Sequence, residues 1–220
     1  MSQPEDTASI SSIKSPRIVF IRSTGHSGST LLDMLISSHP DVVSVGEVVR
    51  FNTAPNTKCT CRRSVWECPF WRAVEEVVRA RFALRLSDLR LTRDDPGTFE
   101  RHNLALFDAV REVSGKQVIV DSSKRLDRLI PLSESDRLDV LPIHLIRKPH
   151  GVVYSHVKRG RDWSTYAEKY AKGLVMTKEY LDHRSHIKLA YDHLVADPTR
   201  TLMRIMHEIG LEYHPDQLAW

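Results

Sequence analysis

A run of small and hydroxyl-bearing residues near the start of the chain has the composition of an anion-binding loop: Gly25, His26, Ser27, Gly28, Ser29 and Thr30. It follows an apolar β-type stretch, Ile18–Ile21, and precedes a segment of helical spacing. We expect that helix to end near Ser38, because Pro40 disfavours a helical conformation at the residue before it. Glycines let the backbone approach an anion closely, and the free N–H groups of a first helical turn point toward it. The run therefore predicts a phosphate-binding loop; the alternative is a turn that only begins a core helix.

This loop differs from the loop of ATP-binding proteins at one position. The Walker pattern, G-x-x-x-x-G-K followed by Ser or Thr, places a lysine directly after its last glycine, where it reaches the β- and γ-phosphates. Here Ser29 stands between Gly28 and Thr30. The chain keeps the backbone that would surround an anion, but it lacks the cation that a triphosphate requires there.

Further polar residues follow other predicted strands. Glu47 comes directly after a glycine that ends one strand, and Lys124 comes three residues after the end of another. Arg147 ends a third strand, and Ser155 lies eight residues later on a predicted helix. Because ligands of parallel sheets bind at the carboxyl ends of the strands, we expect these residues to meet the glycine-containing loop in one crevice.

Each of these residues has two interpretations. Glu47 is a candidate general base if its pocket is shielded from water, or a carboxylate near a helix N-terminus, whose dipole lowers its pKa and weakens it as a base. Lys124 contacts the ligand or is a surface lysine at a helix start. Arg147 and Ser155 hold a phosphate dianion through a guanidinium and a hydroxyl, or are unrelated residues at a strand end and on a helix surface.

The elements that must position these residues alternate along the chain. The predicted strands are Ile18–Ile21, Val42–Val45, Gln117–Asp121, Leu141–Arg147 and Ile187–Tyr191. The predicted helices after the first are Pro69–Leu84, Phe99–Val113, one through Leu126 that is interrupted near Pro131, Lys148–Gly160, Trp163–His183 and Pro198–Ile209. This alternation predicts an α/β fold of three layers, the P-loop fold, with a central parallel sheet of about four to five strands and helices on both faces. We expect residues 17–220 to form a single domain and the polar residues 1–16 to be a disordered tail.

The composition is that of an ordinary globular chain: 220 residues, 41% hydrophobic and 27% charged. A net charge of +4 does not demand a nucleic-acid partner. Basic residues outnumber acidic ones between Arg147 and Lys172, which suits a small polyanion, although a solvated helix face has the same composition. The sequence shows no signal-peptide pattern and no apolar stretch of about 18 residues, so we expect a cytoplasmic protein without a membrane span.

The three cysteines, Cys59, Cys61 and Cys68, lie in a predicted loop, Asn52–Cys68. Three cysteines without a fourth ligand make a poor zinc site, so we expect no metal and reduced, structural thiols. A disulfide between Cys68 and either of the other two is the alternative. A loop of this length could also be part of an acceptor-binding insert.

The run Gly25–Thr30 resembles the 5′-phosphosulfate loop of sulfotransferases that use 3′-phosphoadenosine 5′-phosphosulfate (PAPS). The continuation through His39-Pro40-Asp41 to Gly46-Glu47 is similar to the tyrosylprotein and carbohydrate branches and to small bacterial relatives. The resemblance implies PAPS as the donor and a hydroxyl on a small molecule, a carbohydrate or a peptide as the acceptor. It also implies Glu47 as the base, Lys124 at the bridging oxygen, and Arg147 with Ser155 at the 3′-phosphate.

The sequence departs from that family at several places. His26 stands where Lys or Arg is usual; near phosphate we expect its imidazole to be protonated, supplying a positive charge or a proton. The Asp-Ser-Ser-Lys context of Lys124 also differs. The chain stops at Trp220, so we expect either a missing nucleotide-covering segment or truncation. Trp163 or Tyr166 could stack on adenine, or either could belong to the core.

Two rival functions remain open. A P-loop kinase of small molecules would use Asp121 to hold magnesium and Thr30 as the hydroxyl ligand, and the missing lysine of the loop argues against it. A non-catalytic nucleotide-binding protein is the other rival.

Overall fold

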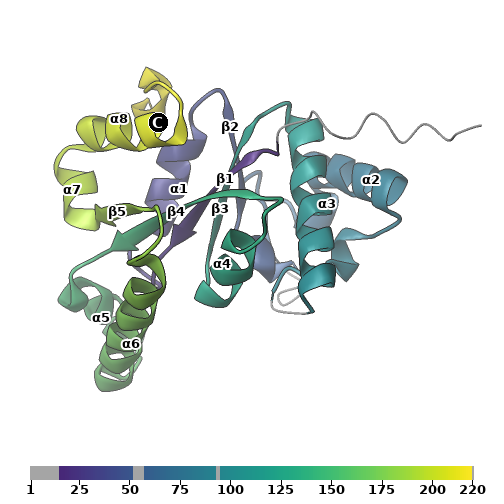
Figure 1. Ribbon diagram of the computed structural model, residues 1–220. Coiled ribbons are helices and arrows are strands. Elements are labelled where there is room, and N and C mark those ends of the chain that lie inside the picture. Colours follow the sequence, from purple (N-terminus) through teal and green to yellow (C-terminus); the bar gives the residue numbers. More distant parts are fainter. Residues whose placement is uncertain (1–14, 52–56, 93–94, 220) are drawn as a thin grey trace, which may run out of the picture.

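The computed structural model describes residues 15–51, 57–92 and 95–219 (Figure 1). The predicted tail therefore lies outside the described residues except for its last two positions. Of these, Ser15 donates a hydrogen bond from its hydroxyl to the carbonyl of Arg137 at 2.9 Å.

A five-stranded parallel sheet forms the centre of the molecule, in the order β2-β3-β1-β4-β5. The strands are β1 (Arg17–Arg22), β2 (Val42–Gly46), β3 (Val118–Lys124), β4 (Asp139–Ile146) and β5 (Ile187–Ala190). β1 is the middle strand, and its carboxyl end leads into the glycine-containing loop. The predicted α/β fold with a parallel sheet is confirmed.

Helices cover both faces of the sheet (Figure 1). They are α1 (Ser29–Ser37), α2 (Pro69–Phe82), α3 (Pro96–Ser114), α4 (Leu126–Ser133), α5 (Pro149–Val157), α6 (Trp163–Leu181), α7 (Tyr191–Ala196) and α8 (Pro198–Ile209). Among the described residues, α1, α7 and α8 lie on one face and α2, α3 and α4 on the other (Figure 1). α5 and α6 pack together beyond the carboxyl ends of the strands.

The alternation of side chains along β1 explains the two layers of helices. Ile18 and Phe20 are fully buried in the core cluster that includes α2 and α3, whereas Val19 and Ile21 are fully buried in the cluster that includes α1 and α8. Successive side chains of a strand point to opposite faces, so an uninterrupted apolar run requires a cover on both sides. β1, which carries the loop, is therefore held by two separate cores.

Several elements differ from the sequence-based prediction, and three of these differences bear on the site or on a predicted interruption. β3 continues beyond Asp121 to Lys124, where the guanidinium of Arg22 donates to the Lys124 carbonyl at 2.8 Å. Tyr191 begins a short helix instead of ending β5. Pro131 lies inside α4 without interrupting it, so the predicted interruption is wrong.

Candidate functional site

The loop between β1 and α1 has the backbone of an anion site. His26 and Gly28 both have a positive φ, 64° and 93°, and Gly28 is the N-cap of α1. The hydroxyls of Thr24 and Ser27 lie 2.8 Å apart, which fixes the turn from inside. The first N–H groups of a helix have no partner within the helix, so those of α1 can donate to an anion.

Arg147 lies directly on this loop, packed against a tyrosine. Its guanidinium donates to the carbonyl of His26 at 2.9 Å and lies 4.4 Å from the centre of the Tyr191 ring. The same ring packs so closely on Gly28 that a side chain there would collide with it. The structure thus brings the cation predicted to bind one phosphate into contact with the loop predicted to bind another.

A basic cluster surrounds His26 at the end of α5 and the start of α6. The imidazole makes an edge contact with His156, with 4.5 Å between the ring centres, and Arg159 lies 3.4 Å from its Nδ1. Burial, and then the charges of Arg159, Arg161, Lys124 and Arg147, lower the pKa of His26 below its ordinary value. This lowering favours the neutral imidazole before an anion binds; its protonation next to a phosphate stays a prediction.

Glu47 and Lys124, the two residues predicted to act on the reacting groups, form an ion pair. The ammonium of Lys124 lies 2.5 Å from Oε1 of Glu47, while Arg50 lies 3.9 Å from Oε2. Lys124 is the last residue of β3, with φ at 67°, and is not a surface lysine at a helix start. The positive φ turns the chain at the strand end, beside Arg22 of β1 in the register of the sheet.

The other predicted ligand residues lie on α5 and α6. Ser155 is half-buried on α5, where its carbonyl accepts a hydrogen bond from Arg159 at 2.9 Å. Tyr166 stacks on His156 with 3.7 Å between ring centres. Trp163 is exposed, so a core role for it is wrong.

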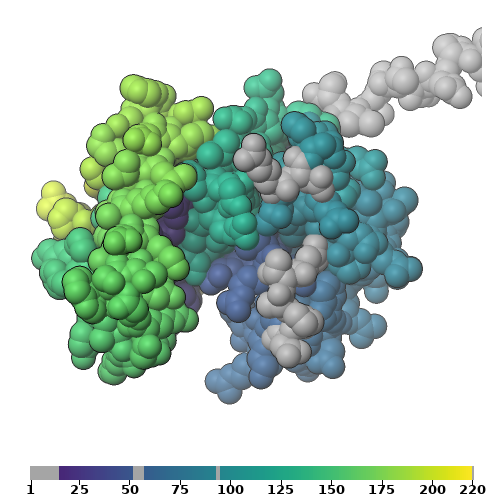
Figure 2. All heavy atoms as spheres, turned by 90° about the horizontal axis from the view of Figure 1, so that it is seen from below, coloured from purple at the N-terminus to yellow at the C-terminus, as the bar shows by residue number. Residues whose placement is uncertain are grey.

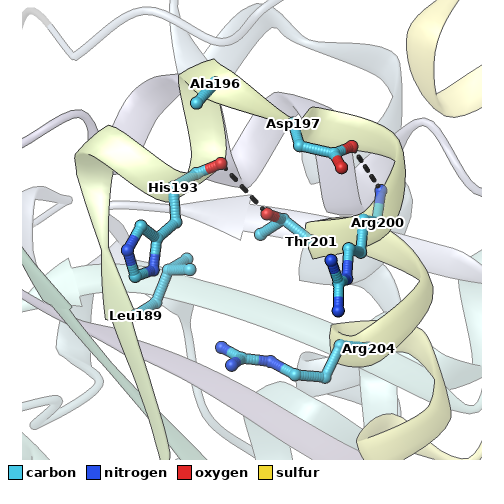
Figure 3. Close-up of a pocket in the computed structure, with 7 residues that line it drawn as sticks. All are labelled: Leu189, His193, Ala196, Asp197, Arg200, Thr201 and Arg204. Atoms are coloured by element: carbon cyan, nitrogen blue, oxygen red, sulfur yellow. Dashed lines mark hydrogen bonds between the residues drawn. The ribbon is translucent and has the colours of Figure 1, made fainter.

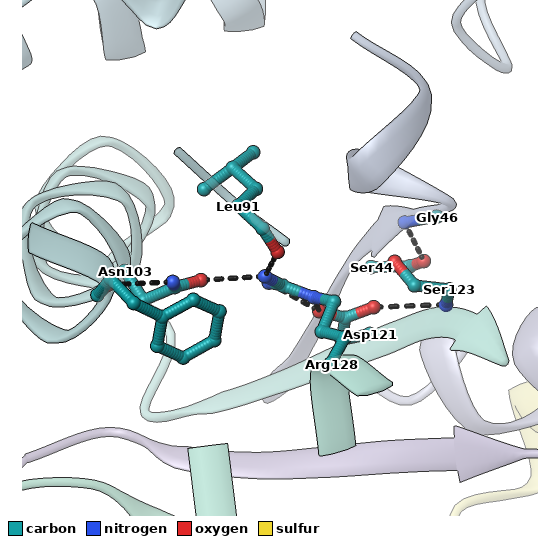
Figure 4. A network of polar contacts seen from close by, with 8 residues as sticks. Ser44, Gly46, Leu91, Asn103, Asp121, Ser123 and Arg128 are labelled. Carbon is teal, nitrogen blue, oxygen red and sulfur yellow. Dashed lines mark hydrogen bonds and ion pairs between the residues drawn. The ribbon is translucent and has the colours of Figure 1, made fainter. Parts of the chain in front are cut away.

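Asp121 belongs to a buried polar network and not to the crevice (Figure 4). Its Oδ2 lies 2.8–2.9 Å from the guanidinium of Arg128, and both side chains are fully buried. Its Oδ1 accepts the backbone N–H of Ser123 at 2.9 Å, and Arg128 also donates to the side chain of Asn103 at 2.7 Å. Asp121 is thereby committed to Arg128, which counts against a magnesium-holding role.

A cavity of about 440 Å³ opens beside Glu47. Its wall is shared by the first turns of α1, the end of β2 and the cysteine-containing segment, including Thr30, Asp33, Glu47, Arg50, Cys59 and Trp71. Figure 2, which views the molecule toward this edge of the sheet, shows the face hollowed between α5–α6 (green) and the segment around α2 (blue). Burial raises the pKa of the Asp33 carboxyl in this wall, and Ser122 donates to it at 2.7 Å.

A second cavity, of about 530 Å³, lies elsewhere, between β5, α7 and α8 (Figure 3). Its polar lining includes His193, Asp197, Arg200, Thr201 and Arg204. Two of these side chains are already engaged locally: Thr201 donates to the His193 carbonyl at 3.2 Å, and Asp197 accepts the N–H of Arg200 at 2.9 Å. None of the predicted site residues lines it.

The sequence reasoning missed two residues that lie at the loop between β1 and α1. Tyr191 was assigned to a strand, and Arg22 was not considered for the site. Arg22 is largely buried at the foot of the loop, where burial lowers its pKa to about 10. A charged residue directly after the apolar run Ile18–Ile21 was the available signal for Arg22; for Tyr191 the sequence offered none.

None of the helices that the structure describes combines the length and apolar character that a transmembrane segment needs. The cytoplasmic location stays a prediction.

Comparisons with known proteins place this geometry within a known fold. No family model and no curated protein matches the sequence. Solved structures do match: the sulfotransferase domain from the curacin biosynthetic pathway at TM-score 0.59 and 16% identity, with 94% of this chain and 78% of that chain covered. The sulfotransferase domain of the olefin synthase from Synechococcus PCC 7002 gives TM-score 0.56, 17% identity and the same two coverages, 94% and 78%. The sulfotransferase STF1 from Mycobacterium tuberculosis H37Rv gives 0.57 and 15%, with 92% and 70% covered. The chain therefore has the fold of these sulfotransferases.

Proposed function

We propose that the chain transfers a sulfuryl group from PAPS to an acceptor hydroxyl. The observation that carries the proposal is the contact between Arg147 and the loop through His26 and Tyr191. Two groups suited to phosphates, the backbone of Gly25–Thr30 and a guanidinium, meet at one point. A nucleotide with phosphates at both ends of its ribose fits such a pair better than a linear triphosphate.

The residues at the carboxyl ends of the strands fit this donor. In the described part of the chain, the buried hydroxyls of Ser23 and Ser123 have no hydrogen-bond partner, so polar hydrogens remain available beside the loop. The backbone of Gly25–Thr30 would hold the phosphosulfate, and Arg147 with Ser155 the 3′-phosphate. When bound, PAPS supplies the sulfuryl group, whose bond to the phosphate oxygen breaks as a bond to the acceptor oxygen forms.

We assign the two remaining functions, stabilising the leaving phosphate and accepting the proton of the acceptor, to Lys124 and Glu47. The ammonium of Lys124 occupies Oε1 of Glu47, so Lys124 must move away before that oxygen can accept a hydroxyl proton. A phosphate on the loop offers Lys124 a second anionic partner. The ammonium then stabilises charge on the leaving phosphate, and Glu47 takes the proton of a hydroxyl that enters through the adjoining cavity. The acceptor class remains a small molecule, a carbohydrate or a peptide.

Thermal-shift and transfer measurements test the proposal together. We expect adenosine 3′,5′-bisphosphate to raise the unfolding temperature and ATP with magnesium not to do so, because a ligand that binds only the folded state stabilises it. Arg147→Ala should weaken bisphosphate binding about 10- to 100-fold, since hydrogen bonds to charged groups contribute about 1.5–3 kcal/mol.

The variant Glu47→Gln separates catalysis from binding. It should retain the bisphosphate shift and lose transfer of labelled sulfuryl from PAPS to a panel of hydroxyl acceptors. Arg50→Ala, which removes the other cation near Glu47, is the matched control and should keep both. Equal stabilisation by ATP with magnesium would favour the kinase. Binding of the bisphosphate without transfer to any acceptor would favour the non-catalytic protein.

A further inference from the structure

The sulfur atoms of all three cysteines in the chain converge on one point. Cys59, Cys61 and Cys68 place their Sγ atoms within 4.8 Å of one another, and Cys59 and Cys68 are 3.5 Å apart. All three are free thiols. From the sequence, the only reason for any of them to meet was the alternative of a disulfide between Cys68 and either Cys59 or Cys61.

Local backbone structure builds this convergence. Cys59 donates its N–H to the Arg63 carbonyl at 2.9 Å, and its own carbonyl accepts the N–H of Arg62 at 2.8 Å. Arg62 has φ at 69°, which closes the turn tightly and brings Cys59 and Cys61 to the same side. Cys68 comes from the other direction, as the N-cap of α2.

The spacing and surroundings suit a metal. Sulfurs around tetrahedral zinc lie about 3.8 Å apart, because each Zn–S bond is about 2.3 Å long. Burial opposes ionisation of Cys59 and Cys68, whereas the nearby backbone N–H of Cys61 favours the thiolate of Cys59, and those of Phe70 and Trp71 favour the thiolate of Cys68. Such N–H donors stabilise and orient thiolate ligands.

The charged side chains around the turn also favour a bound metal ion. Lys58, Arg62 and Arg63 flank the two cysteines of the turn, and all three are exposed. Three thiolates with one Zn²⁺ carry a net charge of −1, which these cations offset.

We propose that Cys59, Cys61 and Cys68 bind one Zn²⁺ as thiolates, with the fourth position open to water or another small ligand. Binding forms three Zn–S bonds and releases the thiol protons to solvent. The objection from sequence was the missing fourth protein ligand, but three protein ligands and an exchangeable one also make a complete tetrahedral site. Because Cys59 lines the cavity beside Glu47, the metal would hold one wall of that cavity in place.

The small number of cysteines makes the test sharp. Cobalt replaces zinc in such sites, and sulfur-to-cobalt charge transfer gives a near-ultraviolet band only where thiolates bind the ion. Since the chain has only three cysteines, any such band must come from this cluster. The reduced, chelator-treated full chain is titrated with Co²⁺ and then with Zn²⁺, following absorbance and the unfolding temperature.

We expect one equivalent of Co²⁺, a charge-transfer band that Zn²⁺ abolishes, and a higher unfolding temperature with either ion. Cys61→Ser removes an exposed ligand without disturbing the core, and it should lose the band and the stabilisation. Cys68→Ser should do the same. Thr60→Ala, which changes the residue between the two cysteines of the turn but removes no ligand, should retain both.

Three results would overturn the proposal. Stoichiometric binding that persists in Cys61→Ser would mean that the ion sits elsewhere. Co²⁺ binding without the band would mean that thiolates do not hold it. A disulfide that forms in the reduced chain instead of the metal complex would assign the cluster to redox chemistry. None of these readouts depends on sulfuryl transfer.

Discussion

Replacing Gly28 by alanine tests whether the loop, Tyr191 and Arg147 form one packed unit. Gly28 has φ at 93°, and a Cβ atom added to it would lie 2.4 Å and 2.5 Å from two carbons of the Tyr191 ring. Those distances are far inside van der Waals contact, so either the loop or the ring must move. Because the ring also stacks on the guanidinium of Arg147 at 4.4 Å, moving it disturbs both of the groups proposed to bind phosphate.

The expected cost has two parts. A left-handed conformation costs a non-glycine residue about 1–2 kcal/mol. Overpacking a site of this kind costs about 1–3 kcal/mol more. Gly28→Ala should therefore lower the free energy of unfolding by about 2–5 kcal/mol, a large part of the stability of an ordinary domain.

Urea unfolding followed by circular dichroism measures this loss, and two further variants divide it. Gly25→Ala is the matched control in the same loop: an added Cβ meets no atom within 4 Å there. It should stay within about 0.5 kcal/mol of the parent chain. The double variant Gly28→Ala/Tyr191→Ala removes the collision but keeps the backbone strain, so its loss should fall short of the sum of the single losses by about 1–3 kcal/mol.

Two outcomes would refute the reasoning. If Gly28→Ala were no less stable than Gly25→Ala, neither the positive φ nor the collision would be present in solution. If the losses from Gly28→Ala and Tyr191→Ala simply added, the two residues would not be in contact.

Two further predictions concern buried and titrating groups. Asp121→Ala leaves the guanidinium of Arg128 buried without its partner and should lower the free energy of unfolding by about 3–5 kcal/mol. The double variant Asp121→Leu/Arg128→Met replaces the pair with apolar side chains and should recover most of that loss. If the single and double variants lost the same free energy, the pair would not be buried. A bound phosphate raises the pKa of His26, which its surroundings lower in the free protein, so binding takes up a proton and affinity for adenosine 3′,5′-bisphosphate should fall as pH rises through the pKa of the complex. Calorimetry in buffers of different ionisation enthalpy measures that proton uptake. The uptake by His26 should be lost in His26→Gln, in which only the phosphates titrate. An uptake unchanged in His26→Gln would exclude His26 as the group that binds the proton.

The apolar periodicity of the sequence was sufficient to predict the layers. The alternation of strands and helices predicted a sheet covered on both faces, and two cores meet at Ile18–Ile21. The helix from Pro198 to Ile209 was predicted to the residue, since Pro begins it and Gly210, with φ at 88°, ends it. Such signals act over a few neighbouring residues, so the sequence displays them directly.

The same reasoning reached most of the candidate site. It placed the loop, Glu47, Lys124 and Arg147 at one edge of the sheet, because strand ends of a parallel sheet share an edge whatever the connections between them. Their roles in transfer stay predictions. What it did not reach was how these residues contact one another.

By itself, then, the sequence determined the α/β layers, the phosphate-type loop and the set of polar residues near it. Only the tertiary structure decided that Lys124 pairs with Glu47, that Asp121 is committed to Arg128, that Tyr191 joins Arg147 to the loop, and that three cysteine sulfurs converge. The physical reason is the distance along the chain over which each interaction acts. Helix ends and strand periods depend on neighbouring residues, whereas a contact between distant side chains depends on how whole elements pack and which way the backbone turns at Gly28, Arg62 and Lys124.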